Sequence, residues 1–231
     1  MKSPRSPGQL LYGVRSPCRW VSGARWSAAL VLLLGARALA GKPPSLEPIR
    51  DEAWSFGASL SWYYVPNDKN FGVLDATADH GPLHFELRYH DEAIGTASAL
   101  IGWNFELGET VKLELTPLVG CLLGDEGGPI VGLLVELRWG PLSFTSQDEW
   151  VWAVQGGKGG LFYAWTELDV RPWHWARAGI VAQRTRLFHT AREVIFGPLV
   201  GFTAWNLDFS FYWFQPGGID QTFSVTLEAR F

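Results

Sequence analysis

The sequence has few of the residues that cross-link small exported domains or bind metals in them. Two of its 231 residues are cysteine, Cys18 and Cys121, one is methionine, and the five histidines are scattered. Because Cys121 is the only cysteine after residue 40, the chain beyond that point cannot form an internal disulfide. No cysteine pair has ligand spacing, so we expect neither a metal site nor another cofactor.

Common catalytic and nucleotide-binding motifs are also missing. No Gly-x-Ser-x-Gly sequence occurs, and the glycine-rich segment 155–160 lacks the Gly-Lys-Ser/Thr ending of a phosphate-binding loop. Beyond residue 40, 13 Lys and Arg are opposed by 23 Asp and Glu, which gives a net charge of −10. An acidic surface of this kind does not suit nucleic acid, which binds to clusters of basic residues.

Long hydrophobic runs are absent beyond residue 40, where none approaches the roughly 20 residues of a membrane-spanning helix. Residues 1–40 contain basic residues but no acid, then the apolar run 28–34, then the small-x-small pattern 38–40. These are the features of a secretory signal peptide, so export is expected. Residues 41–52, with three prolines and mixed charge, are predicted to be an N-terminal lead-in in the periplasm.

What the sequence does contain is a series of short stretches in which apolar and polar residues alternate. Glycine, proline, asparagine and aspartate separate these stretches, which is typical of antiparallel β-strands. The stretches are 53–65, 71–79, 83–90, 96–107, a fifth beginning at Val111, 129–139, 142–153, 161–170, 174–187, 194–204, 207–214 and 221–231.

The last stretch alternates most regularly and ends on the aromatic Phe231. It resembles the closing strand of Gram-negative outer-membrane β-barrels. The resemblance covers about 53–231 and implies an all-β fold: a transmembrane, up-and-down, antiparallel β-barrel of about 12 strands, with ten as the alternative. It also implies residence in the cell outer membrane, contact with its lipid and lipopolysaccharide, and recognition of the C-terminal strand by the barrel assembly machinery.

The connections between these stretches alternate in length. Short connections are expected at 80–82, 108–109, 140–141, 171–173 and 205–206, and longer ones at 67–70, 91–95, 124–128, 155–160, 188–193 and 215–220. Outer-membrane barrels have short turns on the periplasmic side and long loops outside. This alternation therefore predicts that both termini lie in the periplasm.

In a membrane barrel the apolar face of each strand meets lipid and the polar face lines the lumen. The predicted lumen-lining residues are His84, Glu86, Arg88, His90, Glu106, Lys112, Glu114, Glu136, Arg138, Glu149, Glu167, Asp208, Glu228 and Arg230. Carboxylates outnumber basic groups in this set. The simpler interpretation is a packed or water-filled lumen with charges paired across strands, in a structural barrel. The sharper one is a porin-like passive pore whose carboxylates favour cationic or small polar solutes.

The sequence leaves two other functions as alternatives. Some outer-membrane barrels are lipid hydrolases or deacylases, and His84, Ser143 and Asp169 supply suitable residue types without a spaced signature. With the apolar faces turned inward, the same alternation would give a soluble, lipocalin-like periplasmic binding barrel.

Stretch 174–187 places basic residues on both faces, which predicts a bulge in that strand or its extension beyond the membrane.

Overall fold

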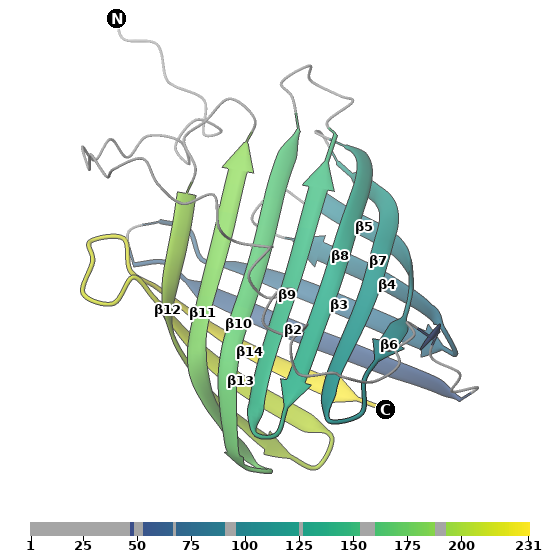
Figure 1. Ribbon diagram of the computed structural model, residues 1–231. Coiled ribbons are helices and arrows are strands. Elements are labelled where there is room, and N and C mark those ends of the chain that lie inside the picture. The colour runs from purple at the N-terminus through teal and green to yellow at the C-terminus, as the bar shows by residue number, and fades with distance from the viewer. Residues whose placement is uncertain are drawn as a thin grey trace, which may run out of the picture. The chain divides into compact units, whose positions relative to one another are not determined.

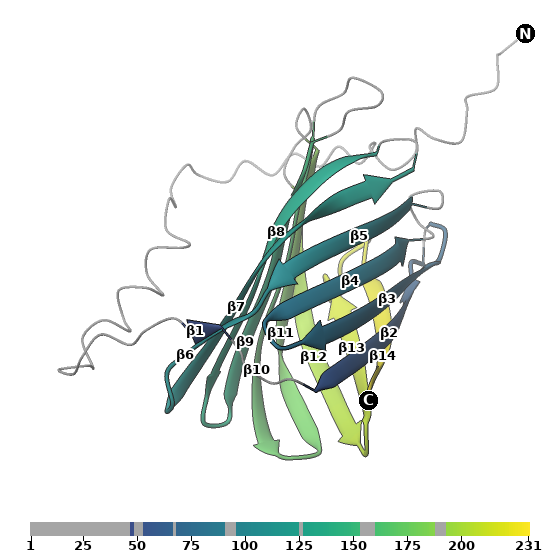
Figure 2. The ribbon, with the colours of Figure 1, turned by 90° about the vertical axis from the view of Figure 1, so that its right-hand side faces the viewer.

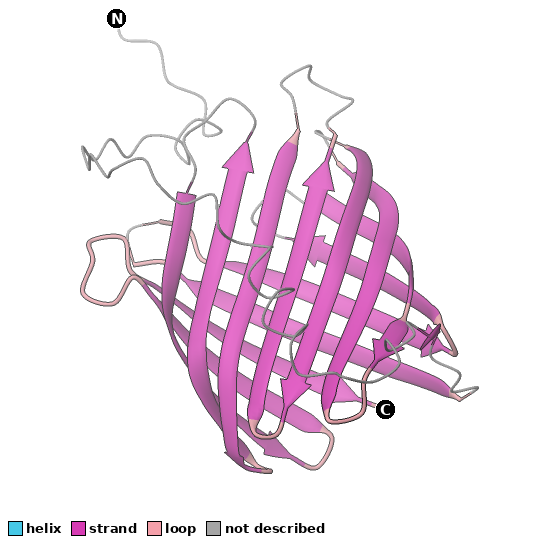
Figure 3. Cartoon of the chain, viewed as in Figure 1, coloured by secondary structure: helices cyan, strands magenta, loops and turns pink. Residues whose placement is uncertain are grey.

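A computed structural model gives the structure of residues 47–48, 53–66, 68–90, 96–124, 127–152, 160–187 and 193–231. Every regular element in these ranges is a β-strand (Figures 1 and 3). The described residues include no helix long and apolar enough to cross a bilayer. The predicted signal peptide, 1–40, lies outside the described ranges, as does most of the predicted lead-in, 41–52.

The strands follow the predicted alternating stretches closely. They are β1 (Glu47–Pro48), β2 (Trp54–Tyr64), β3 (Phe71–His80), β4 (Leu83–His90), β5 (Thr96–Trp103), β6 (Phe105–Leu107), β7 (Val111–Leu123), β8 (Gly128–Trp139), β9 (Leu142–Val151), β10 (Leu161–Trp173), β11 (Ala176–Leu187), β12 (Glu193–Ala204), β13 (Leu207–Phe214) and β14 (Thr222–Arg230).

The strands form one closed antiparallel barrel. Each strand from β2 to β14 pairs with its neighbours in sequence, and β5 and β6 act as one strand interrupted at Asn104, since both pair with β7. Pairing of β14 with β2 closes the ring. Twelve strands therefore make up the barrel, which confirms the predicted up-and-down topology, and the two-residue β1 adds to the edge of β6.

The short and long connections alternate around the ring as predicted. At the end where β3 meets β4 and β8 meets β9, tight turns contain Gly81 and Gly140 with positive φ of 56° and 55°. Glycine suits these positions because it has no Cβ to clash in a left-handed conformation. Figure 1 shows the tight turns of β8–β9, β10–β11 and β12–β13 together at the bottom of the barrel. We call this end the short-turn end and the opposite one the long-loop end.

One connection and one irregularity differ from the predictions. The turn predicted at 171–173 is strand, because β10 continues to Trp173 and the chain turns after it. The register of β10 with β11 shifts between Val170 and Trp173, so that two residues of β10 oppose one of β11. This bulge accommodates Pro172, which has no backbone N–H to donate. The bulge predicted for stretch 174–187 is therefore in the partner strand, β10. Strand β11 itself pairs with β12 without a shift in register.

The two faces of the barrel wall differ sharply in composition. Large apolar side chains point outward and are well exposed, as for Leu87 (62%) on β4 and Phe196 (65%) on β12. On the same β4, the alternate residues Glu86 and Arg88 are only 5% and 9% exposed. Charged groups are therefore enclosed and apolar ones exposed, the reverse of a soluble barrel. Figure 2 shows β2 to β5 side by side in the barrel wall.

The barrel lumen as the candidate functional site

The inward faces of neighbouring strands form a continuous lining, because cross-strand partners share a face. The register connects Ser59 of β2 with Asp75 of β3, Asp75 with Arg88 of β4, and Arg88 with Ser98 of β5. The residues predicted to line the lumen have the inward parity of their strands. The ion pairs between them show which of them are in contact.

Arg88 is the centre of the largest charged cluster. Its Nε donates to Asp75 at 2.6 Å and its Nη1 to Glu149 at 2.8 Å, while Nη2 donates to Glu86. Glu149 also accepts a hydrogen bond from Gln147 at 2.6 Å. One buried guanidinium is therefore shared by three carboxylates, whose formal negative charge it balances only in part.

The contact between Arg88 and Glu149 crosses the lumen. Arg88 lies on β4 and Glu149 on β9, which are four strands apart around the ring. Both side chains are buried, with side-chain exposures of 9% and 7%. Two non-adjacent parts of the wall therefore touch through their side chains.

A second polar chain runs beside this cluster. His84 Nδ1 lies 2.8 Å from Asp79 Oδ1, which also accepts from Asn104 Nδ2 at 2.8 Å, and Thr116 donates to Asn104 at 2.6 Å. The Nε2 of His84 is 3.8 Å from Glu86. The chain thereby joins β3 and β4 to β7 through the interrupted position between β5 and β6.

A third cluster forms around Arg177, which was not among the predicted lumen residues. Arg177 Nη1 donates to Glu167 at 2.7 Å, and its Nη2 donates to Ser210 at 2.7 Å. To reach Ser210 on β13 from β11, the side chain passes over Gly201 of β12, where a Cβ would come within 2.7 Å of the guanidinium Nε. Tyr212 donates to Glu167 at 2.9 Å and completes the cluster.

Near the short-turn end, the remaining predicted residues form looser pairs. Arg138 Nε donates to Glu136 at 2.6 Å, Arg230 Nε to Glu228 at 2.7 Å, and Lys112 lies 3.5 Å from Glu106. Arg138 lies 3.8 Å from Glu114, and Asp208 accepts a hydrogen bond from Thr203. His90 lies apart from these pairs, partly buried at the long-loop end of β4. The basic members of these pairs are about half exposed, so each pair adds little stability.

Part of the lining is apolar, which the predicted set did not include. One buried cluster consists of Leu100, Leu118, Ile130 and Val151, and a second of Val181, Leu199, Tyr212 and Phe214. All of these residues have the inward parity of their strands, and Phe214 has no exposed surface at all. The lumen thus has a charged part, formed by the Arg88 and Arg177 clusters, and an apolar part, formed by the two apolar clusters. The two parts adjoin, since Leu100 is the cross-strand partner of Glu86 and Val181 that of Glu167.

The residues that suggested hydrolysis are not assembled into a catalytic group. Ser143 and Asp169 are cross-strand partners on β9 and β10, whereas His84 is hydrogen-bonded to Asp79. No hydrogen bond in the described parts of the chain joins His84 to Ser143 or Asp169. A nucleophile needs a base within hydrogen-bond reach, so this arrangement offers no support for the hydrolase alternative.

A closed antiparallel barrel with an apolar exterior and charged groups inside has the architecture of the Gram-negative outer-membrane β-barrels. No family model matches the sequence, and no curated protein is similar to it. Among solved structures, the outer membrane protein Omp33 of Acinetobacter baumannii is similar, at 12% identity and a TM-score of 0.41. The similarity covers 79% of this chain and all of that one.

Proposed function

We propose that this protein is an outer-membrane β-barrel whose lumen is closed at rest, so that it acts as a structural membrane protein and not as an open passive pore. The single observation behind this proposal is the ion pair between Arg88 and Glu149. It joins two sides of the wall inside a barrel whose outer surface suits lipid.

Membrane residence is supported by the outward face. Exposed apolar residues of the kind represented by Leu60, Leu87, Ile180 and Phe196 occur on strands all around the ring. Aromatic residues lie near the short-turn end, where Trp173 and Trp175 stack with centroids 5.5 Å apart. Tryptophans at this position suit the interface between lipid and water, where an apolar ring with one polar N–H is favoured.

Closure is supported by two groups of side chains. The charged part spans the lumen through Arg88 and its three carboxylates. The apolar part buries Leu118, Leu199 and Phe214 almost completely, which leaves those side chains no contact with a water-filled passage. A twelve-stranded barrel is intermediate between a filled interior and a wide channel, so side chains of this size suffice to fill it.

A second candidate function is a gated passage for small cationic or polar solutes. It is favoured by the acidic excess of the charged part, where Glu86, Glu149 and Asp75 share one arginine. Rings of carboxylate attract cations, and rearrangement of this cluster would expose them. Export by the signal peptide 1–40 and recognition of the C-terminal strand by the assembly machinery belong to the same proposal, with lipid and lipopolysaccharide as the surroundings.

The experiment that separates these functions is conductance in a planar lipid bilayer. The refolded full chain is inserted and compared with a known open porin under the same voltage and salt. We expect no current steps from this protein, with folding verified by circular dichroism. Steady steps that prefer cations would contradict closure at rest and establish the passive pore. Rare, brief openings that become more frequent in Glu149→Gln would establish the gated passage.

A further inference from the structure

The outer wall of the barrel is interrupted by one polar patch, on β9, β10 and β11. By the register of these strands, Ser146 and Asp148 of β9, Thr166 of β10 and Arg184 of β11 all have outward parity. Asp148 and Arg184 are the only charged side chains with outward parity among the strand residues whose side chains the structure describes. Among those described side chains, the rest of the face is apolar or aromatic, apart from His80 where β3 ends.

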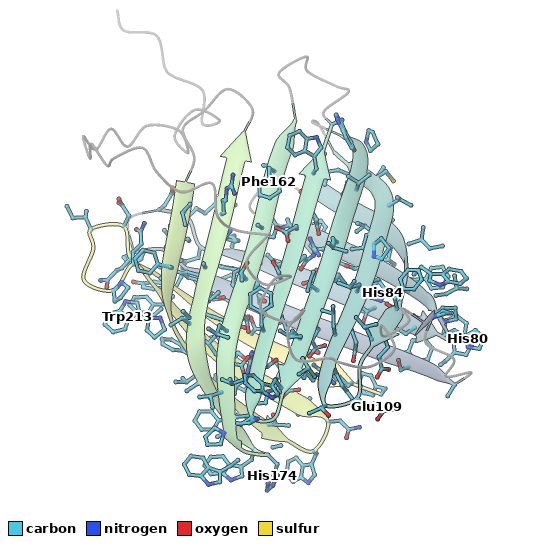
Figure 4. All side chains as sticks on the ribbon, in the orientation of Figure 1. His80, His84, Glu109, Phe162, His174 and Trp213 are labelled. Atoms are coloured by element: carbon cyan, nitrogen blue, oxygen red, sulfur yellow. The ribbon has the colours of Figure 1, made fainter. Side chains whose placement is uncertain are left out.

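The patch has a definite internal order. Asp148 pairs with Ala164 of β10, and Ala164 pairs with Arg184, so acid, small residue and base form one row across three strands. In the next row toward the short turns, Ser146 lies 3.2 Å from Thr166 and 3.1 Å from Asp148. Arg184 also stands over the ring of Phe162, 4.9 Å from its centroid. Figure 4 labels Phe162 on this part of the wall.

The patch lies within the depth of the membrane and not at its edge. Asp148 is six residues along β9 from Leu142 at the short-turn end and four from Trp152. With a rise of about 3.3 Å per residue and a tilt of about 40°, it lies roughly 15 Å from the short-turn edge of an apolar band about 25 Å tall. Charged groups at that depth are unfavourable against lipid tails, so a polar surface is the favourable neighbour.

We propose that this patch is the contact surface between two copies of this chain, related by a two-fold axis along the membrane normal that passes beside Ala164. The inference rests on the proposed membrane location. The two-fold rotation reverses the order of the row in the second copy, so that Asp148 of each copy faces Arg184 of the other. Strand tilt offsets the two groups by roughly 6 Å in depth, within the reach of an arginine side chain.

The composition of the patch fits this second copy better than it fits a lipid headgroup. A two-fold contact requires a self-complementary surface, and the row contains one acid and one base on either side of a small residue. A phosphate would be attracted by Arg184 but repelled by Asp148. Ala164 is small and only 8% exposed, so it adds no bulk between the two walls. The Ser146 and Thr166 hydroxyls can form hydrogen bonds across the contact, as polar residues do between membrane segments.

The test is disulfide cross-linking in membranes, with Cys18 and Cys121 first replaced by alanine. Ala164→Cys places a thiol beside the proposed axis, and Ala76→Cys places one on the outward face of β3 as the matched control. Heat-dependent migration in gels verifies that each variant is a folded barrel. We expect a disulfide-linked dimer for Ala164→Cys and only background for Ala76→Cys. Folded, inserted Ala164→Cys that stays monomeric would overturn the inference and leave the membrane location intact.

Charge exchange identifies the partner. In the Ala164→Cys background, Asp148→Arg or Arg184→Asp alone would create two contacts between like charges, one on each side of the axis. We expect the yield of cross-linked dimer to fall by about tenfold or more. The double variant Asp148→Arg/Arg184→Asp restores both pairs and should restore the dimer. Loss in the single variants without recovery in the double one would overturn pairing between two copies and indicate another membrane protein or a lipid. A chain that stays soluble without detergent would instead overturn the proposed function.

Discussion

The two parts of the lumen are closed by different kinds of interaction. In the charged part, Arg88 gathers three carboxylates, and Arg177 gathers carboxylate and hydroxyl groups from several strands. In the apolar part, Leu118, Leu199 and Phe214 fill the interior without polar contacts. A barrel with an apolar exterior can therefore also have apolar clusters in its interior. The alternation of apolar and polar residues along a strand consequently predicts the outer face better than the inner one.

The charged part should depend most strongly on Arg88. In Arg88→Ala, the carboxylates of Glu86, Glu149 and Asp75 lose their shared partner while remaining enclosed. We expect a loss of about 3–5 kcal/mol in the free energy of unfolding, because an uncompensated buried charge is left behind. Urea unfolding in lipid vesicles, followed by tryptophan fluorescence, measures this change.

The matched control for Arg88 is Arg138→Ala near the short-turn end. Arg138 forms the same kind of pair but has a side chain that is 49% exposed, so its removal should cost less than about 1 kcal/mol. Equal losses in the two variants would mean that the Arg88 cluster is solvated, which would contradict a lumen closed at that level.

The apolar part should respond to loss of volume. Leu118 is 1% exposed in the first apolar cluster, so Leu118→Ala removes buried methyl groups and leaves a cavity at a cost of about 3 kcal/mol. The adjacent Val119 points outward and is 56% exposed, and Val119→Ala should cost well under half as much. The same unfolding experiment compares the two. A larger loss at Val119 would indicate that the faces of β7 are reversed.

The outer face can be broken with a single charge. Leu87→Arg introduces a cation on the lipid-facing side of β4 and should cost about 2–4 kcal/mol near the middle of the bilayer. Ser59→Arg introduces the same cation on the inward face, where Ser59 donates to Asp75 at 3.2 Å, and should cost far less. Refolding yield into vesicles gives a second readout. Equal penalties at the two positions would mean that the exterior is not in lipid.

Much of the fold could be predicted from the sequence, because period-two alternation and turn residues are local signals. Strands such as Leu83–His90 and Leu207–Phe214 were predicted to the residue. The prediction was incomplete where alternation is lost. In β7, Leu118 and Val119 are consecutive apolar residues on opposite faces, so the alternation of apolar with polar residues does not show that Leu118 lies inside. Similarly, Pro172 was interpreted as a turn because a bulge gives no signal of its own.

Less of the site could be predicted, since its contacts depend on how the ring closes. Arg88 and Glu149 are 61 residues apart, and only closure of the sheet brings β4 and β9 together. Arg177 was overlooked because β11 has basic residues of both parities. The opposing Gly201 is the signal that could have identified it, since a glycine across from an arginine leaves room for that side chain to pass. The outward Asp148 and Arg184 are visible in the sequence once the register is known.

The arrangement of faces is tested most directly by quenching tryptophan fluorescence with brominated lipids. Trp62, Trp139 and Trp173 are all more than half exposed on the outside of the barrel. In vesicles containing brominated acyl chains, we expect strong quenching of the folded protein, and weak quenching by acrylamide in the water. Tryptophans protected from brominated lipid, in a monomer that stays soluble without detergent, would contradict an exterior built for the membrane.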